Sequence, residues 1–178
     1  MNVSNDASLP PNVHIRTDLR PGDIGYLTYL HGVLYAAEDG WDSSFEAYVA
    51  GPLAEFAKAH NDRERIWIVE REEVVAGSIA IVEASPEQAQ LRWFLLHPDL
   101  RGRGIGRRLM ELAISFSKAN HYSTIFLWTA SDLGAAAKLY ESFGFKITEE
   151  VRHKLWGVIV TEQRYELKVP ADLGNRFA

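Results

Sequence analysis

The chain of 178 residues contains no cysteine. This absence excludes a cysteine nucleophile, a disulfide framework and thiolate metal ligands, and it is compatible with a reducing compartment such as the cytoplasm. The six histidines are scattered along the chain. Neither an HExxH string nor a close histidine pair marks a metal site, so we expect no metal cofactor.

Long apolar runs and an excess of basic charge are lacking as well. No segment approaches the roughly 20 consecutive apolar residues of a membrane-spanning helix, and no apolar signal core opens the chain. We therefore expect a cytoplasmic protein without a membrane partner. The formal net charge is −5 at pH 7. This charge argues against a nucleic-acid partner, because general nucleic-acid binding favours a broad basic surface.

The hydrophobic pattern predicts an α/β protein with the element order β-α-α-β-β-β-α-β-α-β-β. The expected strands cover residues 13–17, 65–71, 74–83, 90–96, 125–129, 145–154 and 158–169, and the helices cover 23–37, 44–59, 104–119 and 133–143. Asp39-Gly40 breaks the first helix, Pro52 kinks or splits the second, and Gly77 is a candidate bulge. Asp132 is the expected N-cap of the last helix and Gly144 its C-cap. We expect a flexible tail over residues 1–12 and a single domain over 13–178.

The loop Arg101-Gly102-Arg103-Gly104-Ile105-Gly106 is the most informative stretch, because it joins an apolar strand to an amphipathic helix. Alternating glycines let the backbone pass close to a ligand. The first amides of the following helix lack intrahelical acceptors, and the helix dipole adds positive potential there. Arg107 and Arg108 add charge to that of Arg101 and Arg103. The loop therefore predicts a cradle for a phosphate or pyrophosphate.

The spacing distinguishes this loop from other phosphate-binding loops. A P-loop string is absent, and Arg107 stands where the dinucleotide-binding fingerprint needs glycine or alanine. The sequence Arg-Gly-x-Gly-x-Gly, entered from residues 93–98, resembles the acyl-CoA-binding motif of the GCN5-related N-acetyltransferase (GNAT) superfamily. Residues 136–145 resemble its second signature, Ala-x-x-Leu-Tyr-Glu-x-x-Gly-Phe. An ordinary strand-to-helix turn is the alternative interpretation of the loop.

The resemblance covers residues 13–169 and is sharp over 85–145. It implies the GNAT fold, with a mixed, mostly antiparallel central sheet of about seven strands flanked by about four helices. Residues 156–167 also resemble acetyltransferase domains that are fused behind MarR-type regulators. Since this chain has no room for a DNA-binding half, we expect that second likeness to carry no DNA-related function.

The resemblance implies direct transfer of the acetyl group of acetyl-CoA to a primary amine acceptor. In the family the oxyanion donor is a backbone amide at a strand bulge, and the matching amide is that of Leu96. Tyr140 occupies the position of the general acid to the CoA thiolate, and its alternative role is that of a core aromatic residue. The implied cofactor-binding residues are Phe94, Leu95, Leu96, Arg101, Gly102, Arg103, Gly104, Ile105, Gly106 and Arg107.

Two departures from the family pattern bear on function. Leu133 replaces an asparagine that contacts the cofactor, and the strand before the loop lacks the glutamate base of many members. The base is left open among Glu83, Glu38, His31 and a water relay. These departures also motivate the alternative of a non-catalytic acyl-CoA-binding sensor or structural module.

The sequence does not name the acceptor, which is a small molecule or a peptide amine. Aromatic residues expected to border its site are Tyr35, Trp41, Trp67, Trp93, Trp128 and Trp156. Trp41, in an acidic loop, suits a cationic amine, although an acidic surface turn explains the same residues. The long final hairpin offers an edge for a homodimer.

Overall fold

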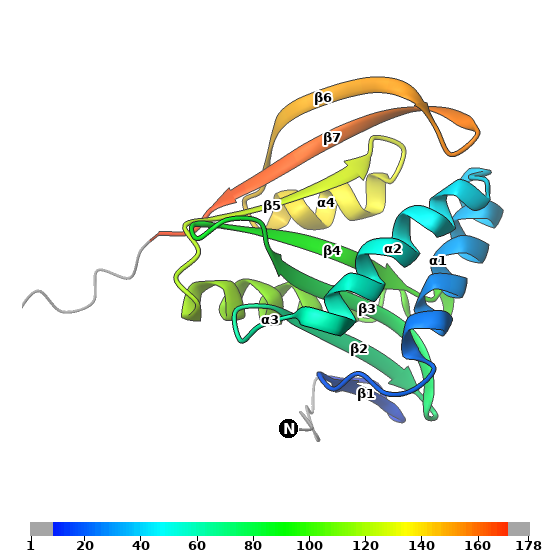
Figure 1. Cartoon of the computed structure of the whole chain (residues 1–178), viewed down its shortest axis with the longest axis horizontal. Helices are drawn as coiled ribbons and strands as arrows, with labels where there is room; N and C mark the ends of the chain where they lie inside the picture. Colours follow the sequence, from blue (N-terminus) through cyan, green and yellow to red (C-terminus); the bar gives the residue numbers. More distant parts are fainter. Residues whose placement is uncertain (1–8, 171–178) are drawn as a thin grey trace, which may run out of the picture.

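The computed structural model describes residues 9–170, and these form one seven-stranded sheet with helices on both faces (Figure 1). The predicted element order is confirmed. The strands are β1 Val13–Arg16, β2 Arg65–Arg71, β3 Val74–Glu83, β4 Gln88–Leu96, β5 Thr124–Ala130, β6 Lys146–Leu155 and β7 Val158–Lys168. The helices are α1 Asp23–Asp39, α2 Ser43–Ala59, α3 Ile105–Ala119 and α4 Gly134–Ser142, with a short 3₁₀ turn at Pro98–Leu100.

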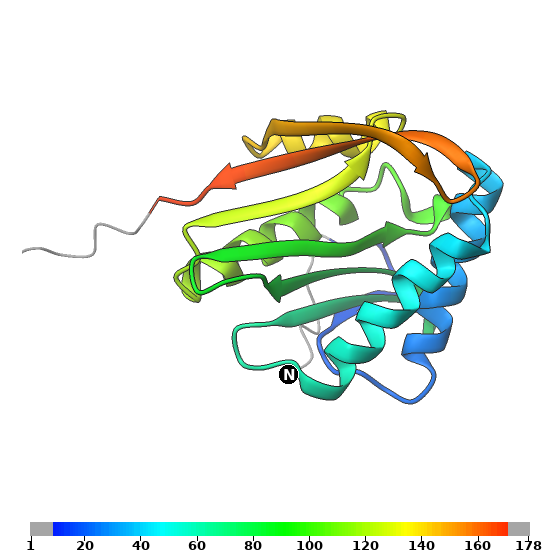
Figure 2. The ribbon, with the colours of Figure 1, turned by 45° about the horizontal axis from the view of Figure 1, so that its top comes forward.

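The strand order in the sheet is β1-β2-β3-β4-β5-β7-β6. Only the β4–β5 pair is parallel, and the other neighbours are antiparallel, so the expected mixed and mostly antiparallel sheet is confirmed. The parallel ladder is short, since residues 88–90 alone pair with residues 124–126. Beyond this point β4 and β5 diverge, and they fan apart in both ribbon views (Figure 2). The divergence leaves backbone groups of β4 without a strand partner on that side.

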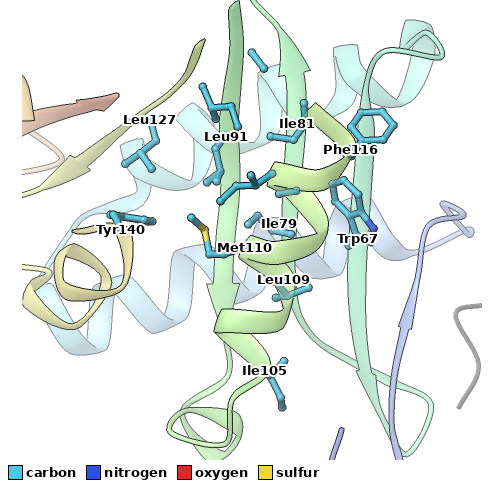
Figure 3. Packing of buried hydrophobic residues seen from close by; sticks show 14 of the residues in the cluster. Trp67, Ile79, Ile81, Leu91, Ile105, Leu109, Met110, Phe116, Leu127 and Tyr140 are labelled. Carbon is cyan, nitrogen blue, oxygen red and sulfur yellow. The ribbon is translucent and has the colours of Figure 1, made fainter. Parts of the chain in front are cut away.

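Two hydrophobic clusters hold the helices on the sheet. The cluster on the α3 face includes Trp67, Leu91, Leu109 and Met110, and α3 packs directly over it (Figure 3). On the other face α1 and α2 cover a second cluster, whose members include Leu27, Phe45, Leu53, Ile68 and Trp93. Leu27, Leu53 and Leu109 are fully buried, and each such side chain contributes roughly 1.5–3 kcal/mol to folding.

The predicted helix ends are confirmed at α1 and corrected at α4. Gly40 ends α1 in the left-handed conformation with φ of +71°. The structure starts α4 at Gly134, with Leu133 in the N-cap position and no side-chain cap, so the prediction of Asp132 as the N-cap is wrong. Leu133 has φ −83° and ψ 56°, and this non-helical residue leaves the Asp132 carboxylate too far back to reach the first-turn amides. The C-cap of α4 is Phe143, so the predicted glycine lies one residue beyond the cap, where Gly144 has φ of +90°.

The structure also tests the predicted break at Pro52 and the predicted bulge at Gly77. Pro52 lies inside α2, which runs unbroken, and the buried contacts of Val49 and Leu53 on either side hold the helix together. The irregular pairing of β3 falls between Val75 and Gly77, opposite β2, so a bulge does lie next to the predicted glycine.

The ends of the described chain are anchored. Of the predicted tail, residues 1–8 lie outside the described residues, while Leu9 packs against the α3-face cluster and Asn12 accepts a hydrogen bond from Glu72. Among residues 9–170 no helix is both long enough and apolar enough to cross a membrane.

Candidate active site

A bulge in β4 shapes the site. Ser78 pairs with Leu95 and Ala80 pairs with Arg92, so β4 carries one residue more than β3 between these pairs. Trp93 has φ of +47° there, and its carbonyl accepts a hydrogen bond from the Ser78 hydroxyl at 2.6 Å. A bulge of this kind turns two successive side chains to one face of the sheet. Accordingly Trp93 joins the cluster under α2, and the Arg92 guanidinium contacts Trp93 and α2 on that same face.

The last residues of β4 direct backbone groups into the gap beside β5. The His97 amide donates to the Ala76 carbonyl of β3 at 2.8 Å. Because backbone groups alternate along a strand, the Leu96 amide and, two residues earlier, the Phe94 amide point away from β3. The Leu96 carbonyl points the same way, and it accepts a hydrogen bond from Arg101 Nε at 3.0 Å. This edge can therefore bond an extended ligand in the manner of a sheet.

The glycine loop has the conformation that the sequence predicts. Gly102 and Gly104 have φ of +72° and +81°, which L side chains rarely adopt, and the space beside each is open. The Arg108 amide donates to the Gly104 carbonyl as the first hydrogen bond of α3. The amides of Ile105, Gly106 and Arg107 thus have no acceptor in the helix, and they open toward a ligand.

A cavity of about 590 Å³ runs from this loop along the gap between β4 and α4. Eight of the ten predicted cofactor-binding residues line it, namely Phe94, Leu95, Leu96, Arg101, Gly102, Gly104, Gly106 and Arg107. The side chains of the other two lie elsewhere, since Ile105 is buried in the α3-face cluster and Arg103 is exposed. We call this space the cofactor-side cavity.

Acidic residues of α1 form part of its wall. The Glu38 carboxylate accepts a hydrogen bond from Arg101 Nη1 at 2.9 Å, so the arginine links α1 to the end of β4. Asp39 has one carboxylate oxygen, Oδ2, that is buried without a partner among the described residues. Burial, with the neighbouring charges of Glu38 and Asp132, raises the pKa of Asp39. Leu133 lines the same cavity, where the family pattern has an asparagine.

A second cavity of about 120 Å³ adjoins the first, and Tyr35, Phe94, Leu133 and Ala136 line both. We call it the acceptor-side cavity. Its walls are aromatic: Tyr35 stacks on Trp41 with ring centroids 4.7 Å apart, and Trp41 contacts Phe45 at 4.5 Å and Trp156 at 4.3 Å. These rings come from α1, α2, the loop between them and the β6–β7 turn, so the cavity assembles segments far apart in the sequence.

Tyr140 lines the acceptor-side cavity, close to the wall that both cavities share. Its ring lies 6.1 Å from Phe94, and Figure 3 shows it reaching from α4 toward the sheet near Leu127. Burial raises the pKa of Tyr140 far above its ordinary value, and the nearby Tyr35 and Tyr165 act in the same direction. The phenol therefore stays protonated at neutral pH.

Five of the six aromatic residues predicted to border the acceptor line this cavity: Tyr35, Trp41, Trp93, Trp128 and Trp156. The prediction is wrong for Trp67, which lies on the opposite face and packs edge-on against Phe116 at 5.5 Å. The cause is the alternation along β2, because Ile66 and Ile68 face α2 while Trp67 faces α3.

The three candidate bases lie in three different places. Glu83 accepts hydrogen bonds from Arg63 and Asn61 near the start of β2, and it lines neither cavity. Glu38 belongs to the cofactor-side cavity. His31 lines the acceptor-side cavity, where burial lowers its pKa to about 4. Its Nδ1 donates to the Leu27 carbonyl at 2.8 Å, which leaves Nε2 as a buried acceptor without a partner among residues 9–170.

Sequence reasoning missed two charged residues of the acceptor-side cavity, Arg92 and Glu162. Glu162 lies on β7 and accepts a hydrogen bond from His153 Nε2 at 2.7 Å. Both residues occur in runs that the motif comparison covers, but neither belongs to a signature position. Within the described part of the chain, no three His, Cys, Asp or Glu side chains are grouped as metal ligands.

Known proteins resemble this chain in sequence. The family model described as "Acetyltransferase (GNAT) family" matches residues 33–145. An uncharacterized N-acetyltransferase of Schizosaccharomyces pombe is 29% identical over 150 residues, covering 81% of this chain and 89% of that protein. The chain spans between 29% and 62% of the length of several other curated relatives.

Solved structures share the fold. An acetyltransferase structure from Salmonella typhimurium, described with its cofactor acetyl-CoA, has a TM-score of 0.73 and 16% identity, covering 94% of this chain and 99% of that one. Spermidine N-acetyltransferase from Vibrio cholerae, in complex with CoA and spermine, has a TM-score of 0.65 and 20% identity, covering 89% and 96%. At these identities the likeness shows the fold.

Proposed function

This chain belongs to the acetyltransferase (GNAT) family of acetyl-CoA-dependent N-acetyltransferases, and we propose that it transfers acetyl directly to a primary amine with Tyr140 as general acid. The observation that carries the proposal is the place of Tyr140. It is a buried phenol beside the shared wall of two cavities, one lined by the glycine loop and the other by aromatic rings. No nucleophilic cysteine exists in the chain, which favours direct transfer.

The residues present fit acetyl-CoA. Backbone amides from Gly102 to Arg107 suit the pyrophosphate, and the edge from Phe94 to Leu96 suits the pantetheine arm. Arg103 and Ile105 contribute backbone amides only, since their side chains lie elsewhere. When bound, acetyl-CoA supplies an activated acetyl group.

The chemistry needs a donor for the carbonyl oxygen and an acid for the thiolate. The Leu96 amide faces the gap and is the proposed donor, because a fixed amide stabilises charge that develops on an oxygen. Tyr140 keeps its proton at neutral pH, since burial raises its pKa. We propose that its O–H donates a hydrogen bond to the departing sulfur as negative charge develops there, and that the proton lost by the amine balances the one that the thiolate gains.

The acceptor amine must be neutral to attack, although a free alkyl amine has a pKa of about 10.4. Of the three candidate bases, His31 is the one that lines the acceptor-side cavity. Its Nε2 carries a lone pair in a neutral ring. We propose that Nε2 accepts a hydrogen bond from the amine, with a water relay carrying the proton outward.

The alternative function is a non-catalytic acyl-CoA-binding module, which Leu133 and the missing strand glutamate favour. The primary amine acceptor has support from the structural neighbour that holds spermine. We further propose a single domain over 13–178 and a homodimer. A cytoplasmic location without membrane or nucleic-acid partners, and the likeness to MarR-fused domains, stay proposals as well.

The test is release of free thiol from acetyl-CoA across a panel of amines, with Tyr140→Phe beside the wild type. We expect the variant to lower the rate at least about tenfold, because general acids contribute that much or more, with acetyl-CoA affinity unchanged. Tyr165→Phe is the matched control, since Tyr165 is equally buried and 5.7 Å from Tyr140 but lines neither cavity.

Each outcome of this assay has a defined meaning. An unchanged rate in Tyr140→Phe removes Tyr140 from the mechanism while the enzyme stands. Tight acetyl-CoA binding without turnover across a broad panel favours the binding module.

A further inference from the structure

Arg92, which is half-buried, differs from several other buried or half-buried arginines of this protein. Arg16 pairs with Asp23 and Glu70, Arg63 pairs with Glu83, and Arg164 pairs with Glu166. Within residues 9–170, Arg92 has neither a carboxylate partner nor a hydrogen-bond acceptor. Its guanidinium lies over the rings of Trp93 at 5.2 Å and Tyr48 at 6.0 Å.

This lone cation lies in the acceptor-side cavity because of the bulge. The extra residue of β4 turns Arg92 and Trp93 to the same face, so the guanidinium lines the cavity under the aromatic walls. Burial lowers the pKa of Arg92, and no anion of the protein offsets this cost. A partly desolvated cation without a counter-charge is less stable than one that is paired with a carboxylate. A ligand that places an anion beside the Arg92 guanidinium therefore gains an ion pair that the protein itself does not form.

The geometry of a guanidinium selects the anion. Its planar fork matches a carboxylate through two parallel hydrogen bonds. The same cavity has one carboxylate of its own, Glu162, whose oxygen is held by His153 at 2.7 Å. Opposite charges in one small cavity suit a ligand that carries both an ammonium and a carboxylate.

The size and the aromatic walls of the acceptor-side cavity restrict the class of ligand further. A cavity of about 120 Å³ favours a small acceptor over a large one, and the rings of Tyr35, Trp41 and Trp156 favour an apolar side chain. A polyamine would place positive charge near Arg92, which is unfavourable for a like-charge pair.

We propose that the acceptor is a small amino acid with an apolar or aromatic side chain, whose carboxylate is bound by Arg92. This inference rests on the proposed acetyl transfer to a primary amine, and it names the class of that amine. Arg92 acts here as a specificity residue, because it binds a part of the acceptor that does not react.

The test compares each amino acid with the amine that lacks only its carboxylate. Phenylalanine is paired with phenethylamine, leucine with isoamylamine, and aspartate and spermine are added as polar and cationic acceptors. We measure kcat/KM by thiol release, and the binding of each acceptor to the CoA-loaded protein by calorimetry. The wild type should prefer the amino acid of its best pair by about 100-fold, which is near the upper end of what one charged, hydrogen-bonded contact contributes.

The variant Arg92→Gln should remove this preference through a higher KM for the amino acid, whereas the matched amine, which lacks the carboxylate, should not lose kcat/KM to the same extent. Arg164→Gln is the control, because Arg164 also lies over a ring, that of Phe126 at 4.0 Å, but lines neither cavity. It should leave the preference intact.

The outcomes separate the two proposals. Turnover of amines with no preference for the carboxylate, or a preference that survives in Arg92→Gln, overturns the inference while the acetyltransferase stands. Binding of amino acids that depends on Arg92, without turnover, overturns the proposed transfer while it supports Arg92 as the residue that binds the carboxylate. Failure of every amino acid to bind or react overturns the inference as well.

Discussion

His31 is a titratable side chain that the fold keeps neutral, and this has a consequence for stability. Its pKa is about 4 in the folded protein and ordinarily 6.5, so between these values the unfolded chain binds more protons. The stabilisation is therefore complete above pH 6.5 and is lost as the pH falls toward 4. The loss from this group amounts to about 3 kcal/mol, from 1.36 kcal/mol for each pKa unit.

We expect His31→Gln to flatten this part of the pH profile. Urea unfolding of the wild type and the variant at several pH values between 4 and 7 measures the difference in slope. The control is His14→Gln, because His14 is exposed on β1 and should leave the slope as it is. Equal slopes for His31→Gln and the wild type would refute the assignment to His31.

The predictability of the site residues depends on how they act. The position of most of the glycine loop and of Tyr140 beside the cavities could be predicted from the sequence, since these residues belong to continuous motifs. Arg92 could not be predicted in this way. Strict alternation along β4 would group it with Phe94, and only the pairing with β3 shows that Trp93 shares its face. Glu162 likewise reaches the cavity only through the register of β7 against β5.

At the scale of elements, β3 and β4 approach closely where the site begins. A Cβ added to Gly77 would lie 2.5 Å from the Leu95 carbonyl oxygen and 2.7 Å from Leu96 Cδ2. The first of these atoms belongs to the backbone, so the strands must shift to accept even a methyl group. The same residues of β4 carry the amides assigned to acetyl-CoA, which couples this contact to binding.

Gly77→Ala should lower the free energy of unfolding by about 2 kcal/mol, the usual cost of overpacking, and weaken acetyl-CoA binding several-fold. Denaturant unfolding and calorimetry measure the two effects. Gly51→Ala, in exposed α2 with open space around it, should instead be neutral or stabilise by about 0.5–1 kcal/mol. Unchanged acetyl-CoA affinity in a destabilised Gly77→Ala would show that the edge of β4 does not hold the cofactor.

The elements were more predictable than their ends and irregularities. The predicted strands and helices all occur, because periodicity of two or about 3.6 residues survives in each of them. The N-cap of α4 was wrong because a single non-helical residue, Leu133, separates Asp132 from the helix. The bulge in β4 contains no glycine, so the residue types at the bulge do not indicate it.

At the scale of the molecule, the site exists because β4 and β5 pair over only three residues and then separate. The helices α1 and α2 cover one side of this opening, and α3 and α4 cover the other. The β6–β7 turn closes the acceptor end by docking on the α1–α2 loop. There the Asp42 amide donates to the Trp156 carbonyl at 2.9 Å, and Gly157 leaves no room for a Cβ beside the Asp42 carboxylate.

Trp156 is the part of this turn that reaches the acceptor-side cavity. Its ring lies 4.3 Å from Trp41 and 4.8 Å from Phe45, so Trp156→Ala removes one wall while the cofactor-side cavity keeps all its lining residues. We expect the KM for the acceptor to rise about tenfold, which corresponds to about 1.4 kcal/mol, because the acceptor loses its contact with the indole ring. The KM for acetyl-CoA should stay within about twofold.

Steady-state kinetics with each substrate varied in turn measure both constants. Ile159→Ala is the control, because Ile159 belongs to the same hairpin but is 65% exposed and lines neither cavity. It should change neither KM. Trp156 lines the acceptor-side cavity but not the cofactor-side cavity, although the two cavities share Tyr35 and Phe94. An equal rise of both constants in Trp156→Ala would therefore mean that the turn stabilises the whole fold and does not act as a wall of the acceptor-side cavity. A selective rise in the acceptor KM would instead locate acceptor binding beneath a hairpin that belongs to neither family signature.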